Sequence, residues 1–221
     1  NSHQTYERQA AAAADAQKAW LDKIAASSTE QINSDPELLN FAMSGGKALF
    51  NENCAACHAP GGAGRPNFPV LADDDWLWGG SLAAIEQTIR HGIRASDPDT
   101  RMNIMPNFGT DDILKPEQIA DVANFVRSLS GEEVDPAAAK RGASVFADNC
   151  VACHADQGKG NAELGAPNLT DQIWLHGGDM AAIVAQISAP KHGVMPAWQG
   201  RLSDSQIKML AVYVHALGGG Q

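Results

Sequence analysis

The chain has 221 residues, of which 44% are hydrophobic, 6% aromatic and 19% charged. This apolar share suffices for a buried core and excludes a disordered chain, while the scarcity of aromatic residues predicts a core of aliphatic side chains or of a bound group. The 16 basic and 26 acidic residues give a net charge of −10, which excludes tracking along nucleic acid and suits a basic protein partner.

Residues 1–43 are expected to form a lead-in to the first folded unit. The Ala-rich stretch 9–20 predicts a helix with little to bury, and the polar stretch 29–36 predicts its end. A solvated tether is the preferred interpretation of this lead-in, and a strap packed on the following domain is the alternative. No apolar run approaches the roughly 20 residues that span a bilayer, so membrane contact is expected only through an anchor absent from this chain.

From Gly45 onward the sequence repeats itself. GKALFNENCAACH at 46–58 returns as GASVFADNCVACH at 142–154. Further repeated positions, paired across the two copies, are Pro69 with Pro167, Trp76 with Trp174, Met105 with Met195, and Phe125 with Tyr213. The offsets of 88 to 98 residues differ only as loop-length changes would make them differ. The chain therefore predicts two homologous units, 44–130 and 136–221, joined by the acidic linker 131–135.

Each unit predicts three helices and no convincing strand. The first helices are expected at 46–53 and 142–149, the middle helices at 81–91 and 179–188, and the closing helices at 115–129 and 203–217. Ser81, Asp179 and Ser203 are the expected N-caps. The predicted fold is mostly α, and the short linker predicts that the two units pack together.

The motif Cys-x-x-Cys-His occurs once in each unit, at 54–58 and 150–154, and is typical of covalent haem attachment. Two thiols three residues apart in a turn can each add to one haem vinyl group, and the following histidine then supplies the proximal nitrogen to iron. The residues expected to hold two haem c groups are Cys54, Cys57 and His58 in the first unit and Cys150, Cys153 and His154 in the second.

Three other interpretations of the cysteines are weaker. A zinc site would place its cysteine pairs closer than Cys57 and Cys150, although two incomplete zinc sites remain open. A thioredoxin-like thiol pair would follow a strand, and no βαβ pattern is present. Two local disulfides would close very short loops and stabilise little. Covalent haem explains both copies of the motif.

The sixth iron ligand is expected to be methionine in both units. Met105 and Met195 occupy equivalent positions, each before a proline and ahead of a closing helix. Met102 competes with Met105, and His192 competes with Met195. An exchange of the two methionines between the haems also stays open. His/Met ligation raises the reduction potential of a haem.

Two further pairs of residues are candidates for supporting the haems. The carbonyls of Pro69 and Pro167 are placed to accept the Nδ1 proton of the haem histidines, although a simple turn explains these prolines equally well. Trp76 and Trp174 are expected near a haem edge or propionate, with core packing as the alternative.

Both units resemble class I cytochrome c domains, with Gly-x-x-x-Phe, Cys-x-x-Cys-His, Pro-x-Leu, Met-Pro and a closing helix that bears an aromatic residue. The chain is also similar to the P subunits (subunit III, di-haem cytochrome c) of bacterial cbb3-type cytochrome c oxidases. The matching segments are DPELL at 35–39, LADDDWLWGG at 71–80, GAPNLTD at 165–171 and VMPAW at 194–198.

That resemblance implies a fold of two tandem cytochrome c-like domains on the periplasmic side of the inner membrane. It implies electron relay from a soluble or membrane cytochrome c donor toward the other oxidase subunits, with no catalytic centre in this chain. It also implies ligation by His58, Met105, His154 and Met195. Residues 1–33 are then the region after a membrane anchor.

A free periplasmic di-haem carrier or the cytochrome subunit of a dehydrogenase is the alternative function, and a di-haem peroxidase is a weaker one. A peroxidase needs one haem without a stable sixth ligand, which the paired Met-Pro motifs disfavour. Residues 1–130 carry a net charge of −7 and residues 131–221 a net charge of −3. The first unit is therefore expected to dock a basic donor.

Overall fold

The computed structural model describes residues 2–218, so residue 1 of the expected lead-in and residues 219–221 of the expected second domain lie outside the described part. The described part is mostly α-helical, as predicted, and its only β-type pairings are isolated bridges. The elements in chain order are α1 Ser2–Ala26, α2 Thr29–Ser34, α3 Pro36–Asn53, α4 Ala55–His58, the 3-10 helix Pro60–Gly62, α5 Leu82–His91, α6 Pro116–Leu129, α7 Pro136–Asn149, α8 Val151–His154, α9 Met180–Ser188 and α10 Asp204–His215.

The ends of the helices follow local capping chemistry. The carboxylate of Asp35 accepts a hydrogen bond of 2.9 Å from the backbone N–H of Glu37, and Pro36 occupies the first turn, so α3 begins ten residues before the predicted start at residue 46. Asp135 caps α7 in the same way. The three predicted N-caps of the middle and last helices are present, at Ser81, Asp179 and Ser203.

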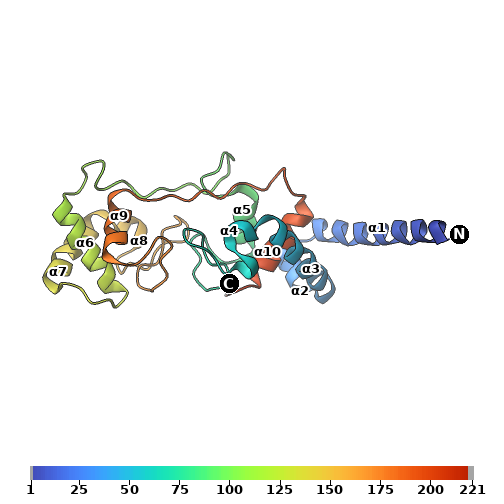
Figure 1. The fold of residues 1–221 in the computed structure, drawn as a ribbon, viewed down its shortest axis with the longest axis horizontal. Helices are drawn as coiled ribbons and strands as arrows, with labels where there is room; N and C mark the ends of the chain where they lie inside the picture. The colour runs from blue at the N-terminus through green and yellow to red at the C-terminus, as the bar shows by residue number, and fades with distance from the viewer. Residues whose placement is uncertain (1, 219–221) are drawn as a thin grey trace.

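The helices form two bodies that do not coincide with the two sequence units. The first body contains α3, α4, α5 and α10, and the second contains α6, α7, α8 and α9 (Figure 1). Helix α10 packs on α3 and α5, while α6 packs on α7 and α9. The expected units 44–130 and 136–221 therefore each contribute helices to both bodies, because their closing helices have changed places.

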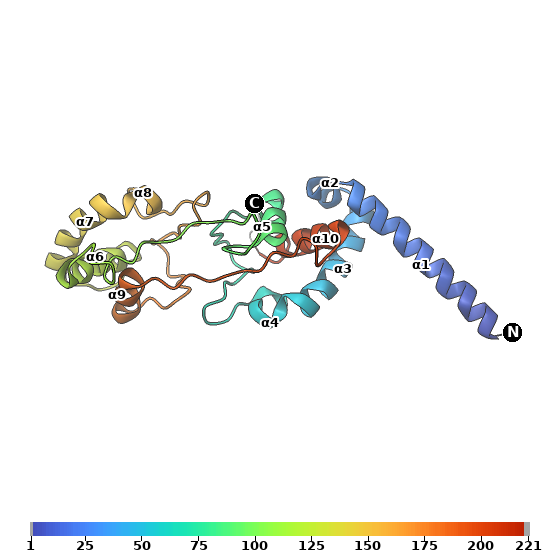
Figure 2. The same ribbon diagram turned by 90° about the horizontal axis from the view of Figure 1, so that it is seen from above.

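Two long segments carry this exchange between the bodies. Residues 92–115 lead from α5 of the first body to α6 of the second, and residues 189–203 lead back from α9 to α10 (Figures 1 and 2). The backbones of Ile93 and Met195 donate to each other, with both N···O distances 3.0 Å. At the other end of the crossing, the N–H of Phe108 donates to the carbonyl of Ile187 at 3.2 Å. Each methionine segment is thus tied to the middle helix of the other unit.

Two features explain why the closing helices exchange. Only residues 130–135 separate α6 from α7, and a connection this short places the two helices side by side as an antiparallel pair. Helix α6 is then unavailable to α3, so the first body is completed by α10.

Side chains on the paired helices also distinguish the partners. Arg141 on α7 makes two hydrogen bonds to Asp121 on α6, of 2.8 and 2.6 Å. At the equivalent positions of the first body, Gly45 faces Met209, and a Cβ on Gly45 would lie 2.7 Å from the methionine sulfur. The unexchanged pairing would set Arg141 against Met209, which offers no carboxylate to its guanidinium, and would leave Asp121 opposite Gly45 without this ion pair.

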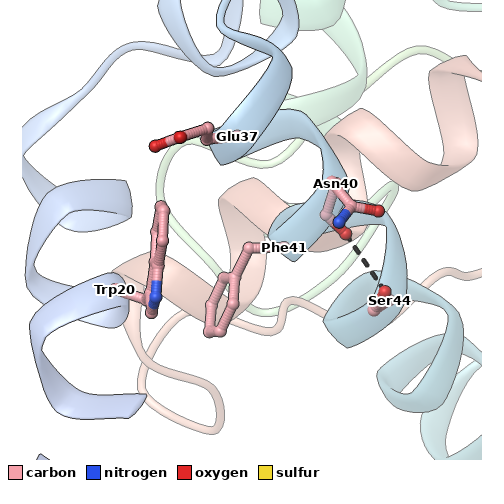
Figure 3. Close-up of a pocket in the computed structure, with 5 residues that line it drawn as sticks. All are labelled: Trp20, Glu37, Asn40, Phe41 and Ser44. Atoms are coloured by element: carbon pink, nitrogen blue, oxygen red, sulfur yellow. Dashed lines mark hydrogen bonds between the residues drawn. The ribbon is translucent and has the colours of Figure 1, made fainter. Parts of the chain in front are cut away.

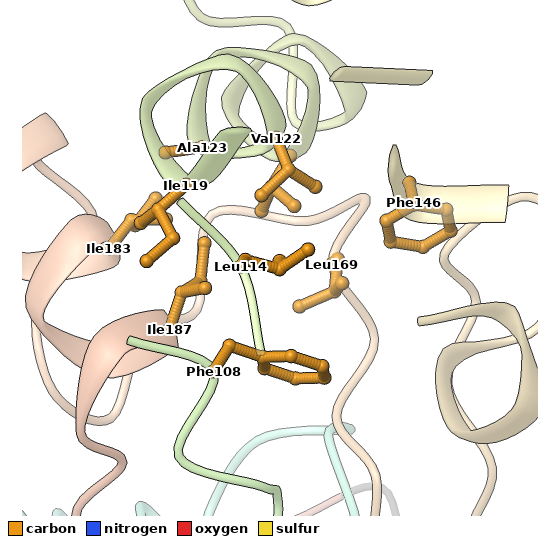
Figure 4. Close-up of a cluster of buried hydrophobic side chains, with 10 residues drawn as sticks. Phe108, Leu114, Ile119, Val122, Ala123, Phe146, Leu169, Ile183 and Ile187 are labelled. Carbon is orange, nitrogen blue, oxygen red and sulfur yellow. The ribbon is translucent and has the colours of Figure 1, made fainter. Parts of the chain in front are cut away.

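Each body has its own apolar core. The core of the second body combines residues of α6, α7 and α9 with residues of the loop before α6, including Phe108 and Leu114 (Figure 4). The core of the first body joins Phe50 of α3 to Ile207, Leu210 and Tyr213 of α10. Each core therefore contains the closing helix of the other sequence unit.

The lead-in is a strap from about Trp20 onward, so the preferred tether interpretation is wrong for this part. Ile24 and Ile32 are fully buried in a third cluster with Met209. Trp20 stacks on Phe41 across a pocket between α1 and α3, with ring centroids 5.6 Å apart (Figure 3). The strap was not the preferred interpretation because its few buried residues are spread over the end of α1, α2 and the start of α3.

The first part of α1 is different, since residues 3–19 are exposed along its length. In Figures 1 and 2 this part of α1 projects away from the first body. No helix in the described part of the chain has the length and apolar character needed to cross a membrane.

Candidate haem centres

The first Cys-x-x-Cys-His motif lies where α3 gives way to α4. Cys54 ends α3, and the one-turn helix α4 brings the backbone N–H of His58 to 2.9 Å from the carbonyl of Cys54. The motif is thus a single helical turn in which Cys54 and Cys57 form no disulfide. His58 Nδ1 lies 3.2 Å from the carbonyl oxygen of Pro69, which leaves Nε2 for a metal.

The second motif repeats this geometry in the second body. Cys150 ends α7, and the N–H of His154 lies 2.9 Å from the carbonyl of Cys150 in the one-turn helix α8. His154 Nδ1 lies 3.0 Å from the carbonyl oxygen of Pro167. Both prolines that the sequence offered as supports therefore contact their histidines.

The environment of these side chains favours cofactor ligation over thiol chemistry. Burial lowers the pKa of His58 and of His154, which keeps both imidazoles neutral and able to ligate iron. Burial raises the pKa of Cys54 and of Cys150 to about 11, whereas a reactive dithiol requires a depressed thiol pKa. The thioredoxin-like interpretation is therefore disfavoured.

The two methionines lie in the bodies opposite to their own sequence units. Met195 packs in the core of the first body with Cys54 and Trp76. Met105 packs in the core of the second body, together with Cys150 and Trp174. Each methionine thus lies in the body where an exchange between the haems, left open by the sequence, would place it, and this placement follows from the exchange of the closing segments.

The two competing ligands are placed less favourably. Met102 is 62% exposed on the segment that leads from α5 to α6, whereas Met105 belongs to a buried cluster. His192 is half-buried, like Met195, but the side chain of this segment that packs against the core of the first body is that of Met195. Met105 and Met195 are therefore the candidate ligands that pack against the two cores.

Two observations test whether these residues fit a haem. Trp76 Nε1 is buried without a hydrogen-bond partner among the described residues, and an indole N–H in that state calls for an acceptor such as a haem propionate. A Cβ on Gly80 would lie 2.6 Å from the ring of Trp76, and Gly178 stands in the same relation to Trp174. The repeated glycines therefore fix both tryptophans beside the attachment sites, and the residues fit the group.

The zinc interpretation has no support in the described part of the chain. The one group there with metal-ligand spacing is His91, Asp97 and Asp99, which contains no cysteine. Asp97 already accepts from His91 and from the N–H of Asp99, so this cluster is a capped turn after α5.

Some features of the sites were missed at the level of sequence. The repeat shows that Met105 and Met195 are equivalent but not in which body each one lies. The available signals were the six-residue connection between α6 and α7 and the complementary pairs at positions 121 and 141.

Comparison with known proteins agrees with these centres. Residues 43–130 match the family described as cytochrome c, and residues 137–214 match the family described as cytochrome c oxidase, cbb3-type, subunit III. The chain is 54% identical over 207 residues to the cbb3-type cytochrome c oxidase subunit FixP of Bradyrhizobium sp. (strain ORS 278), which covers 90% of this chain and 70% of that protein.

Other relatives show the same pattern. The FixP subunit of Sinorhizobium medicae is 52% identical over 96% of this chain and 73% of its own length. The subunit CcoP of Azospirillum brasilense is 52% identical over 93% of this chain and 72% of its own length. These similarities cover both bodies and most of the strap.

Proposed function

Because this chain belongs to the FixP/CcoP family of cbb3-type cytochrome c oxidase subunits, we propose that it relays electrons through two haem c groups, one in each body. The chain is an electron-transfer subunit of such an oxidase. The observation that carries it is the pair of equivalent Cys-x-x-Cys-His turns, each beside an apolar core against which a methionine also packs.

In the proposed ligand set, each haem takes its histidine from one sequence unit and its methionine from the other. Cys54, Cys57 and His58 would hold the first haem with Met195, and Cys150, Cys153 and His154 would hold the second with Met105. When bound, each haem supplies a one-electron ferric/ferrous couple. The protein keeps Pro69 and Pro167 on the histidine Nδ1 atoms, which fixes the ring orientation and raises the basicity of the ligating nitrogen.

A histidine and a methionine ligand at each iron would leave no position for a substrate. This supports a relay without a catalytic site of its own and argues against the peroxidase alternative. Family membership favours the oxidase over a free carrier or a dehydrogenase subunit. We place the chain on the periplasmic side of the inner membrane, with its partners among the other oxidase subunits and a cytochrome c donor.

The haem content tests this proposal. Protein matured with the covalent haem-attachment machinery should have an intact mass equal to the polypeptide plus two haems, and both haems should be low-spin in both oxidation states. Cys150→Ala with Cys153→Ala should remove one haem and leave the other. A mass showing one haem or none in the unmodified protein would contradict the proposal.

The charge distribution indicates which body meets a basic donor. The sequence units suggested the first, but the exchange reverses this: residues 105–188 of the second body carry 5 basic and 12 acidic groups, net −7. Residues 1–93 and 189–221 together carry a net charge of −3. We propose that the second body, at the end of the molecule away from α1, docks the donor (Figure 1).

A matched pair of charge reversals tests the docking proposal. Asp148 and Glu52 are exposed at equivalent positions of the two bodies. Asp148→Lys should slow association with a basic cytochrome c by about 3- to 10-fold at low ionic strength, with the difference fading as salt rises, because screened charges no longer steer the encounter. Stopped-flow reduction measures the rate. An equal or larger effect of Glu52→Lys would contradict the proposal.

A further inference from the structure

The two bodies touch through two contacts that the internal repeat relates to each other. Trp78 and His176 are equivalent, as the third residue of Trp-Leu-x-Gly-Gly, and Asn67 and Gly165 are equivalent, two residues before Pro69 and Pro167. Trp78 of the first body lies on Gly165 of the second, and His176 of the second lies on Asn67 of the first. The interface is thus self-complementary in the manner of a two-fold symmetric dimer.

The contact at Trp78 is close and buried. Trp78 is 9% exposed, and its indole ring occupies the position that a Cβ on Gly165 would take. The guanidinium of Arg101 lies over the same ring, 5.4 Å from its centroid. Beside it, Asn103 donates a hydrogen bond of 2.7 Å to the carbonyl of Leu164 in the second body. Only glycine at residue 165 allows the bodies to approach this closely.

The second contact is polar. His176 Nδ1 lies 2.9 Å from Asn67 Oδ1, so the ring donates and the amide oxygen accepts. Burial lowers the pKa of His176, and the nearby Lys191 and His192 lower it further. The imidazole is therefore neutral near pH 7, and the hydrogen bond does not depend on a charged ring.

Both contacts lie near the haem histidines. Each ends two residues from a proline whose carbonyl holds a histidine Nδ1, at Pro69 for His58 and at Pro167 for His154. Burial, and after it the negative charge of Asp171 across the same boundary, raises the pKa of Asp75 to about 6. The two contacts therefore hold together loops that carry unfavourable like charges.

We propose that the Trp78–Gly165 and His176–Asn67 contacts are the positioning elements that fix the separation of the two haems and so control electron exchange between them. This inference rests on the proposed function, since it requires one haem in each body. Trp78 and His176 position the haem-bearing loops through their neighbours and ligate no iron.

Gly165→Ala tests the proposal, with Gly131→Ala as its matched control. Both glycines have positive φ, of 60° and 82°, but a Cβ at Gly131 meets nothing within 4 Å. Exchange between haems is measured in half-reduced protein by two-dimensional NMR of the haem methyl groups, and each haem potential by redox titration. Gly165→Ala should slow electron exchange between the haems about tenfold or more, because electron transfer depends steeply on how the two haems are placed relative to each other. The spectra and reduction potentials should be retained. Gly131→Ala should match the unmodified protein.

Asn67→Ala is the second variant, since it removes one acceptor without inserting bulk. It should also slow exchange, by less than Gly165→Ala, and should decide the question alone if Gly165→Ala does not mature with two haems. The proposal would be overturned if both variants exchanged electrons between the haems at the rate of the unmodified protein. If only Asn67→Ala matures, an unchanged rate in that variant alone would overturn it. Equal slowing by Gly131→Ala would also overturn it. Fewer than two haems in the unmodified protein would instead refute the proposed function.

Discussion

Removal of Met105 should affect the haem attached at Cys150 and Cys153, and removal of Met195 the haem attached at Cys54 and Cys57. The reason is the exchange, which places each methionine in the core of the other sequence unit. Loss of the thioether should convert that haem to high spin or to a replacement ligand and lower its reduction potential by on the order of 0.1 V, since the thioether favours ferrous iron.

Single-haem proteins make the assignment unambiguous. In Cys54→Ala with Cys57→Ala, only the haem of the second body remains. Adding Met105→Ala should abolish the absorption band of the methionine–ferric iron bond, and adding Met195→Ala should preserve it. The reciprocal background, Cys150→Ala with Cys153→Ala, should give the opposite result. Loss of the band with the methionine of the same sequence unit would contradict the exchanged pairing.

Met102→Ala is the control for this series. Met102 is 62% exposed and lies three residues before Met105, so its removal tests nonspecific damage to the same segment. It should leave the spectra and potentials of both haems unchanged. An effect as large as that of Met105→Ala would mean that the segment, rather than the thioether of Met105, determines the spectrum.

The local features of this protein were predictable from its sequence. The turn at Cys54–His58 follows from the motif, and the N-caps at Ser81 and Ser203 follow from the hydrogen-bonding capacity of a short hydroxyl side chain before an apolar helix. The contact between His58 and Pro69 was predicted with no preference over a simple turn, because a proline in a loop forms a turn as often as its carbonyl accepts a hydrogen bond from a histidine. Features that depend only on residues within one or two turns can be predicted from adjacent residues in the sequence.

The partner of each closing helix was not predictable from the apolar pattern. Ile119 and Ile207 are equivalent in the repeat, so α6 and α10 offer nearly the same buried face to either first helix. The choice depends on the short connection between α6 and α7 and on polar or steric pairs such as Asp121 with Arg141. These signals concern residues outside the apolar stripe, where periodicity carries no information.

The strap was underestimated for a related reason. An Ala-rich helix has a weak apolar stripe, and its contribution to the core rests on a few positions such as Ile24 and Ile32. Lys208 of α10 donates to the carbonyl of Ala25 at 2.8 Å, a contact between residues 183 positions apart. Contacts of this range become visible only once α10 is known to complete the first body.

Fragment 1–131 should not fold as a cytochrome on its own, and it should be rescued by fragment 132–221. In the isolated fragment, α3 lacks α10 and α6 lacks α7. Helix α10 alone buries six large apolar side chains, at Ile207, Met209, Leu210, Val212, Tyr213 and Val214. At about 1.5 kcal/mol or more for each, their loss matches the 5–15 kcal/mol that stabilises a typical domain.

Circular dichroism and haem absorption of the separate and coexpressed fragments measure this. Coexpressed fragments should associate without a covalent linker, because the α6–α7 and α3–α10 contacts both cross the cut, and should regain two low-spin haems. Deletion of residues 1–17, of which residues 3–17 are exposed on α1, is the control and should leave folding unchanged. A monomeric fragment 1–131 with one stable His/Met haem would contradict the exchange. In such a fragment α6 would have packed on α3, which places Asp121 opposite Gly45.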